Sequence, residues 1–327
     1  MTAMRALRFE ETGSLDRLQV RDVARPRPGP GEIVVEVHAA SVNPSDVKNV
    51  LGRMPQTTLP RTCGRDFAGI IVDGPSTLRG LEVFGLGGGL GFWRDGTHAE
   101  CVVLPQDGVV RKPPGLSMSC AASLCLSYVT AYYSLLEIGG LSKGASVLVT
   151  GVSGSVGSAA AAIAAHRRAK VIGIARHKPN NGFLHRFISL EDPDWPKLVR
   201  DATGSDGVAL AFDTIGAPIF AGVTQTLAHR GRLVAIASTE TPVVSFDLVD
   251  FYHREASIRG ADTVSLSIQA CAAMLRELVP QFADGTFSPP PLREFPLDEA
   301  VSVYRRLNSG ELKGKPILVP NGYKRQV

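Results

Sequence analysis

The sequence, 327 residues long, predicts an α/β protein that combines a doubly wound parallel sheet with a second, β-rich part. Three observations lead to this fold class. Apolar strand patterns alternate with helical patterns from residue 145 to residue 238, which is typical of a parallel sheet covered by helices. The first 105 residues consist of short strand patterns and turns. The length, at roughly 150 residues per domain, predicts two domains.

The N-terminal part predicts short strands joined by turns. Residues 1–24 form a hairpin or a pair of strands, and the proline- and glycine-rich segment 24–32 forms a rigid turn. Segment 41–54 contains a short helix that Ser45 or Asp46 caps. Further strands are expected at 33–40, at 63–74 and on both sides of the glycine-rich loop in 81–105.

The segment 145–178 predicts a strand, a glycine turn, a helix and a second strand. Residues 146–150 are apolar and β-branched, as in a strand buried on both faces. The three glycines that follow permit a tight turn, a close approach of backbone N–H groups to a pyrophosphate, and close packing of helix on strand. An alanine-rich helix over 158–169 would present its N-terminus to the phosphate. The residues of this turn that we expect to bind a dinucleotide are Gly151, Ser153, Gly154, Ser155, Val156 and Gly157.

The end of the second strand, 170–175, indicates which dinucleotide binds. NAD-specific folds place an Asp or Glu about 20 residues after the glycines, whereas NADP-specific folds accommodate the additional phosphate with cations. Arg176, His177 and Lys178 lie at this distance from Gly157, and no acid is among them. Arg offers a phosphate a planar fork, and Lys offers it a point charge. We therefore predict NADPH; the alternative is that the three residues form a solvated basic turn.

Two later strands carry further candidate residues. They are expected at 207–216 and 231–238, and ligands of doubly wound folds bind at the carboxyl ends of such strands. Asp213 is expected to cap its strand rather than to react. The candidates at the two strand ends are Ile215, Gly216, Ile236, Ala237 and Ser238. The rest of the chain predicts helices at 267–282 and 296–310 and a final strand within 313–320.

Composition and charge exclude several classes of function. The net charge of +4 is spread along the chain, without the basic stripe of a nucleic-acid-binding protein or a polybasic membrane anchor. The five cysteines are odd in number and include no CxxC pair, so neither a disulfide framework nor a zinc lobe is predicted. The first residues include acids and no uninterrupted apolar run is long enough to cross a bilayer, so we expect a cytoplasmic protein with reduced cysteines.

Along nearly its full length the sequence resembles the medium-chain dehydrogenase/reductase superfamily, in particular its zinc-free, zeta-crystallin-like quinone oxidoreductase branch. The segments that carry the resemblance include RPGPGEIVVEVHAASVNPSD, CGRDFAGIIVDG, SYVTAYYSLLE, VLVTGVSGSVGSAA and LKGKPILVP. The resemblance implies a Rossmann domain at 123–261 and a GroES-like domain built from 1–122 and 262–327, with NADPH in the cleft between them and assembly as a homodimer. It also implies that Thr130 lies beside the nicotinamide; the alternative is that Thr130 bonds back to its own helical turn.

Departures from the family pattern bear on catalysis. Zinc-dependent relatives hold a catalytic zinc with a cysteine and a histidine where this chain has Asn43 and Arg65, so no metal site is predicted. Relatives that reduce enoyl thioesters place a tyrosine as proton donor where this chain has Met54. We expect Asn43 to hydrogen-bond a substrate carbonyl and Arg65 to stabilise its negative charge, unless Arg65 pairs with an acid such as Asp66. Lys48 is a candidate proton donor if its pKa is lowered, and otherwise a solvated lysine.

The segment after Lys178 also differs from the family pattern. The family has a helix after the residues that match Lys178, whereas this chain has a short segment that begins with the helix-breaking Pro179. The adenine side of the site is therefore expected to be more open. His98 is expected to be a histidine of the β-rich part rather than a catalytic base.

The sequence thus predicts an NADPH-dependent, zinc-free oxidoreductase that transfers hydride to a quinone or another α,β-unsaturated carbonyl compound. Such chemistry belongs to the cofactor, and the protein supplies orientation and excludes water. Three alternatives remain open. They are an enoyl thioester or alkenal double-bond reductase, a non-enzymatic NADPH-binding sensor, and a metal-dependent alcohol dehydrogenase with unusual ligands.

Overall fold

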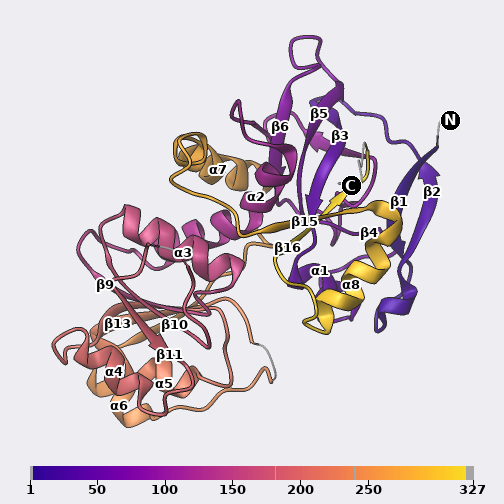
Figure 1. Cartoon of the computed structure of the whole chain (residues 1–327). Helices are drawn as coiled ribbons and strands as arrows, with labels where there is room; N and C mark the ends of the chain where they lie inside the picture. The colour runs from indigo at the N-terminus through magenta and orange to yellow at the C-terminus, as the bar shows by residue number, and fades with distance from the viewer. Residues whose placement is uncertain (1–2, 181, 239–240, 322–327) are drawn as a thin grey trace. The chain divides into compact units, whose positions relative to one another are not determined.

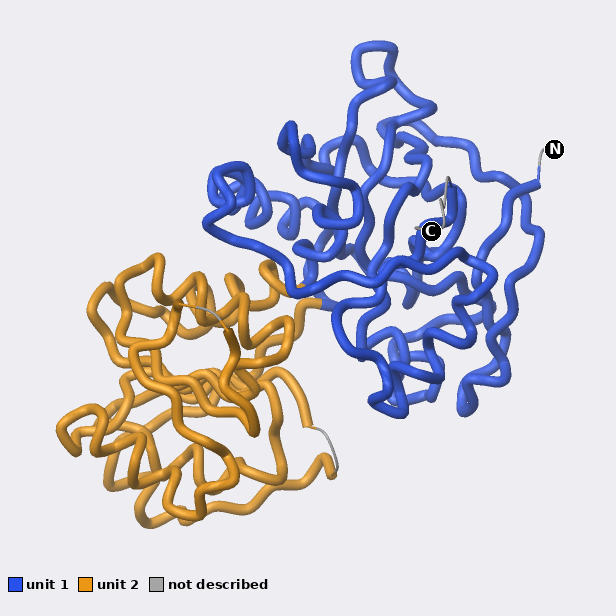
Figure 2. Tube along the Cα trace, in the orientation of Figure 1, with its two compact units in different colours: residues 1–126, 264–327 blue, residues 127–263 orange. Residues whose placement is uncertain are grey.

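A computed structural model describes residues 3–180, 182–238 and 241–321. The chain forms two compact units (Figure 2). Unit 1 contains residues up to 126 and from 264 onward, so both ends of the chain contribute to it, and unit 2 contains residues 127–263. The boundaries expected from the sequence, after residues 122 and 261, differ from these by four and two residues.

Unit 1 is built on two sheets, a small antiparallel one and a larger one that is antiparallel except for the parallel pair β15 and β16. In the smaller sheet, β1 (Ala3–Phe9) pairs with β2 (Gln19–Ala24) and with β4 (Arg61–Thr62), which gives the expected pairing near the N-terminus. The larger sheet has the order β15-β16-β3-β5-β6-β8, and β7 also pairs with β3. Its strands are β3 (Glu32–Ser41), β5 (Asp66–Asp73), β6 (Glu82–Leu86), β7 (Cys101–Pro105), β8 (Val110–Arg111), β15 (Leu292–Pro296) and β16 (Lys315–Val319).

Helices close two of the hydrophobic cores of unit 1. Helix α7 (Ile268–Ala283) begins after Ser267, whose hydroxyl accepts a hydrogen bond from the Ala270 amide at 3.1 Å, and it contacts β6. Helices α1 (Pro44–Val50) and α8 (Ala300–Asn308) pack together on the other core, where Tyr304 is fully buried. Burial of an apolar side chain in such cores contributes about 1.5–3 kcal/mol.

Helix α2 (Met118–Tyr132) continues as a six-residue π-helix, η2 (Tyr133–Ile138). Among the described residues, this combined helix alone is long and apolar enough to cross a membrane by length and composition. No such segment was expected from the sequence, because serines and threonines interrupt its apolar run. Since 78% of its apolar 18-residue stretch is buried inside the protein, we assign it as a core helix.

Unit 2 is a parallel six-stranded sheet with the order β11-β10-β9-β12-β13-β14. In Figure 1, helix α3 lies on one face of this sheet and helices α4, α5 and α6 lie on the other. The strands are β9 (Ser146–Thr150), β10 (Lys170–Ala175), β11 (Arg186–Ser189), β12 (Val208–Asp213), β13 (Leu227–Ala235) and β14 (Ser257–Gly260). The helices are α3 (Ser155–His166), α4 (Trp195–Asp201), α5 (Phe220–Gln225) and α6 (Leu248–His253). The predicted combination of a Rossmann sheet with a GroES-like part is confirmed.

Two differences in unit 2 concern the nucleotide turn. Helix α3 starts at Ser155, three residues earlier than expected, because Gly154 is its N-cap. Between β10 and β11 the described residues form no helix, as the segment around Pro179 predicted. Within its described residues, the connection between these two parallel strands therefore places no helix against the sheet.

Candidate functional site

The strand order of unit 2 places the candidate dinucleotide residues at one edge of the sheet. Counted along the chain, the order is 3-2-1-4-5-6, which reverses between β9 and β12. Ligands of such sheets bind in the crevice outside the carboxyl ends of the strands at this reversal. The turns after β9, β10, β12 and β13 and the first turn of α3 carry every predicted dinucleotide residue except Thr130, which lies buried in α2.

The glycine turn has the steric features that a pyrophosphate site requires. Gly151 adopts φ +61°, in the left-handed region that favours glycine. A Cβ on Gly157 would lie 2.3 Å from the Gly151 carbonyl oxygen, so only glycine lets α3 approach β9 this closely. A Cβ on Gly154 would meet only that oxygen, at 3.3 Å, so the backbone here faces open space. Ser153 and Gly154 are exposed, and Ser155 and Val156 are partly exposed at the start of α3.

Asp213 connects the turns after β9 and β12. Its Oδ1 accepts hydrogen bonds from the Thr150 hydroxyl at 2.7 Å and from the Ile215 amide at 3.0 Å. The Gly216 amide also donates to the Asp213 carboxylate, at 3.2 Å. A Cβ on Gly216 would lie 2.4 Å from the Ala237 carbonyl oxygen, which brings the turn after β13 into the same place. Asp213 therefore caps its strand end, as expected, and orders the backbone of the predicted site.

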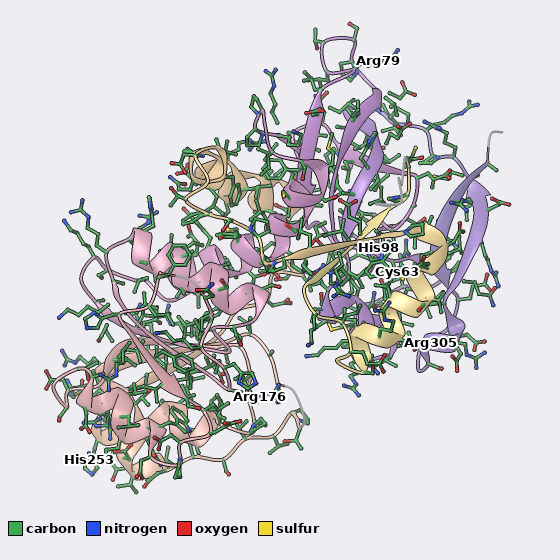
Figure 3. All side chains as sticks on the ribbon, in the orientation of Figure 1. Cys63, Arg79, His98, Arg176, His253 and Arg305 are labelled. Atoms are coloured by element: carbon green, nitrogen blue, oxygen red, sulfur yellow. The ribbon has the colours of Figure 1, made fainter. Side chains whose placement is uncertain are left out.

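The basic residues after β10 are available to an anion. Arg176, His177 and Lys178 are all exposed, and Figure 3 shows Arg176 at the surface of unit 2. Their side chains form no hydrogen bond or ion pair with another described residue. Three cationic or neutral donors without internal partners, next to a strand end that carries no acid, are suited to a phosphate group.

The predicted catalytic residue Asn43 lies in unit 1 at the N-cap of α1 and is only 2% exposed. Its Nδ2 donates to Asp66 Oδ2 at 3.1 Å and to the Ser41 carbonyl oxygen at 3.4 Å. Its Oδ1 accepts a hydrogen bond from Lys315 Nζ. Both amide hydrogens are thus engaged within the protein, so a hydrogen bond from Asn43 to a substrate carbonyl would have to replace one of these contacts.

Arg65 lies against the same cluster. It is 5% exposed, its Nη1 donates to Ser45 Oγ at 3.1 Å, and its guanidinium lies 5.2 Å from the centre of the Phe92 ring. The acid that its charge affects most clearly is Asp46. Burial raises the pKa of Asp46 to about 6, while the Arg65 charge opposes this rise.

Lys48, the third predicted catalytic residue, lies on α1. Partial burial, followed by the charge of Arg53, lowers its pKa, as a proton donor would require. Its role stays a prediction.

Lys315 is the residue of this cluster that the sequence analysis missed. It begins β16, is 5% exposed and is 272 positions away from Asn43, to which it donates. Burial lowers the pKa of Lys315, and the charges of Asp66 and Asp46 oppose this shift. The only signal in the sequence is a lysine directly before an apolar strand, which does not distinguish a buried ammonium from a solvated one.

His98 is fully buried and structural. Its Nε2 lies 2.9 Å from the Ser41 carbonyl oxygen and its Nδ1 lies 2.9 Å from the Tyr304 hydroxyl, so Nε2 carries the proton and Nδ1 accepts. Burial lowers the pKa of His98 to about 4. Figure 3 shows it beside Cys63, whose carbonyl oxygen accepts from the His98 amide at 2.9 Å. This neutral histidine connects the first and last parts of unit 1.

The residues present do not fit a catalytic zinc ion. At the positions that resemble the ligand positions of zinc-dependent relatives, Asn43 is held by protein partners and Arg65 carries a positive charge. Among the described residues, no group of three or more His, Cys, Asp or Glu side chains is arranged to hold a metal ion. We therefore derive no step through zinc.

Two family models match the chain. The model described as "Zinc-binding dehydrogenase" matches residues 155–280, and the model described as "Alcohol dehydrogenase GroES-like domain" matches residues 29–114. The first covers most of unit 2 and the beginning of the returning part of unit 1. The second covers most of the large sheet of unit 1.

Individual proteins are similar over nearly the whole chain. Zinc-type alcohol dehydrogenase-like protein C337.11 of Schizosaccharomyces pombe is 34% identical over 315 residues, which cover 94% of each chain. A mycocerosic acid synthase-like polyketide synthase of Mycobacterium tuberculosis is 30% identical over 98% of this chain and 16% of its own length. A solved structure of an NAD-dependent alcohol dehydrogenase is 29% identical with a TM-score of 0.85, covering 97% of this chain and 99% of that one.

Proposed function

Since this chain belongs to the medium-chain dehydrogenase/reductase superfamily and is therefore an oxidoreductase, we propose that it uses NADPH to reduce a quinone or another α,β-unsaturated carbonyl compound. The choice of cofactor rests on the exposed residues Arg176, His177 and Lys178. None of the three is acidic, and their side chains form no hydrogen bond or ion pair with another described residue. An NAD-binding fold holds the ribose hydroxyls with an acid at this place.

The proposal assigns each part of the site in unit 2 a task. The turn from Gly151 to Gly157 and the N-terminus of α3 hold the pyrophosphate, and Arg176 and Lys178 hold the 2′-phosphate. The turns containing Gly216 and Ala237 contact the nicotinamide half, together with Thr130. When bound, NADPH supplies the hydride.

The acceptor is assigned to the buried polar cluster of unit 1. Reduction of a quinone or enone places negative charge on a carbonyl oxygen, and Arg65 offers a fixed positive charge in a site of low dielectric. Quinones tolerate the absence of the family's tyrosine best, because water can protonate the oxyanion that forms.

The similarity to part of a polyketide synthase favours a second candidate, reduction of the double bond of an enoyl thioester. Here the carbonyl belongs to a thioester and the hydride is added to the β-carbon. An enoyl thioester carries a long pantetheine arm, which the protein would have to accommodate. Activity with a coenzyme A thioester therefore tests this candidate directly.

We also propose that the protein is a cytoplasmic homodimer. The thiols of all five cysteines are free, which suits a reducing compartment. Strand β14 is the edge of the unit 2 sheet and exposes Ile258, and further apolar side chains are exposed on α6 and in the segment before it. An open sheet edge is suited to pairing with the same edge of a second copy around a twofold axis. The residues are Val243, Leu248, Val249, Tyr252 and Ile258.

The test is a steady-state assay of NADPH oxidation with a panel of quinones, enones and crotonyl-coenzyme A, combined with calorimetric binding of NADPH and NADH. The proposal expects acceptor-dependent oxidation and clear preference for NADPH. Tight NADPH binding without turnover of any acceptor would instead identify a non-enzymatic sensor. Activity confined to the thioester would favour the second candidate.

A further inference from the structure

A cluster of polar side chains is buried in unit 1 where β3, α1, β5 and β16 meet. Its charges balance formally, with two acids and two cations, and none of its members is more than 5% exposed. Asn43 is the centre, because its amide contacts Asp66 on one side and Lys315 on the other. The members are Asn43, Asp46, Arg65, Asp66 and Lys315.

The acids of this cluster are satisfied by hydrogen bonds that do not involve Lys315. Asp66 accepts from the Ser41 amide at 2.7 Å and from Asn43 Nδ2 at 3.1 Å. Asp46 accepts from the Asn43 amide at 2.7 Å. These contacts fix both carboxylates, and the second hydrogen of the Asn43 side-chain amide is donated to the Ser41 carbonyl oxygen at 3.4 Å.

Lys315 has unused hydrogen-bonding capacity in this cluster. Its ammonium has three N–H donors, and within the described residues it makes one hydrogen bond, to Asn43 Oδ1. A buried cation whose donors have no acceptor is costly, so an arrangement of this kind favours an additional oxygen ligand. The nearby charges of Asp66 and Asp46 keep the ammonium in place without accepting those hydrogens.

We propose that Lys315 is the catalytic residue that donates a hydrogen bond, and then a proton, to the carbonyl oxygen of the acceptor. This inference rests on the proposed reductase function and deepens it. It replaces Asn43, whose amide hydrogens are engaged, as the donor to the carbonyl, and it fills the role of the tyrosine that Met54 replaces. Asn43 then becomes a positioning residue that holds Nζ.

The proton balance of the step is simple. When hydride adds to the acceptor, an electron pair moves onto the carbonyl oxygen, and that oxygen takes a proton from Lys315 Nζ. The lysine becomes a neutral amine and regains a proton from water, so the acceptor gains two electrons and two protons in total, one of them in the hydride. Burial and the Arg65 charge, which lower the pKa of Lys315, favour this release, whereas Asp66, Asp46 and Cys125 oppose it.

The first test compares Lys315→Met, which removes the donors, with Lys313→Met, an exposed lysine two residues away. We expect the first variant to lose about 100-fold or more in kcat with the best acceptor and to keep NADPH affinity within about twofold. The control variant Lys313→Met should keep both the wild-type kcat and the wild-type NADPH affinity. The basic limb of the kcat profile against pH, which the proposal assigns to Lys315, should disappear in Lys315→Met. An unchanged kcat and pH profile in a folded Lys315→Met enzyme would overturn the inference but leave the proposed function intact.

The second test needs neither turnover nor a variant. 4-Nitrophenol, whose anion absorbs at longer wavelength than its neutral form, mimics the oxyanion of the reduced acceptor. We expect the wild-type protein to bind it as the anion, and trace acetylation with acetic anhydride to show that the probe protects Lys315 but not Lys313. Binding without protection of Lys315 would overturn the inference even if Lys315→Met did not fold. Failure of the wild-type enzyme to oxidise NADPH with any acceptor would overturn the proposed function and this inference together.

Discussion

Replacement of Arg176 by alanine tests whether the basic group after β10 reads the 2′-phosphate. Arg176 is exposed and makes no contact that the fold needs, so its removal should leave the melting temperature unchanged. A charged hydrogen-bonded pair contributes about 1.5–3 kcal/mol, which corresponds to roughly a 10- to 150-fold loss of NADPH affinity. NADH lacks the phosphate, so its affinity should stay the same.

The assay is calorimetric titration of both dinucleotides at low and high salt. Because the contact is exposed, the difference between wild type and Arg176→Ala should shrink as salt rises. Arg167→Ala is a matched control, since Arg167 is an exposed arginine at the opposite end of α3. Equal losses for NADPH and NADH, or the same loss in the control, would show that Arg176 does not bind the 2′-phosphate.

Four further predictions address the rest of the structure. Gly157→Ala should abolish NADPH binding in calorimetry, because its Cβ would lie 2.3 Å from the Gly151 carbonyl oxygen; normal affinity would contradict the turn geometry. Tyr304→Phe removes the donor to buried His98 Nδ1 and should lower the free energy of unfolding in urea by about 1–3 kcal/mol. Asp46 has a raised pKa of about 6, so it destabilises the fold as pH rises from about 4 to 6. Asp46→Asn should therefore gain stability relative to wild type between pH 4 and pH 7, and an equal difference at both pH values would argue against this titration. Ile258→Lys should convert the dimer to a monomer in light scattering, and a wild-type monomer would remove the dimer proposal.

The nucleotide unit could be predicted because its signals are local. The apolar run of β9, the glycines at 151, 154 and 157 and the alanine-rich α3 follow one another within about twenty residues. The backbone conformation of Gly151 and the close packing at Gly157 require glycine, and the spacing of the glycines in the sequence already indicates both. Asp213 was likewise interpretable, since a strand-end carboxylate commonly binds the amides that follow it.

Short strands at the sheet edges could not be predicted. Strands β11 and β14 have four residues each, and most side chains of β14 are exposed, so neither shows the apolar run of a buried strand. These strands form because they pair in parallel with β10 and β13. The residues of the short strands themselves give no indication of this pairing. Strand β15 was missed for the same reason.

The substrate side of the site depends on contacts that are distant in sequence. Lys315 and Asn43 are 272 positions apart, and His98 and Tyr304 are 206 positions apart. The sequence predicted Asn43 as a group that faces the substrate, whereas the structure uses its whole amide to join Asp66, Ser41 and Lys315. Which polar group keeps a spare donor is decided by this packing, so residue type alone could not identify it.

The choice of cofactor is tested most directly by the ratio of the dissociation constants of the wild-type protein for NADH and NADPH, measured by calorimetry at physiological salt. We expect NADPH to bind at least about tenfold more tightly, since the contact of one guanidinium with the 2′-phosphate is sufficient for that difference. Equal dissociation constants for the two dinucleotides would contradict the assignment of Arg176, His177 and Lys178 and with it the choice of cofactor.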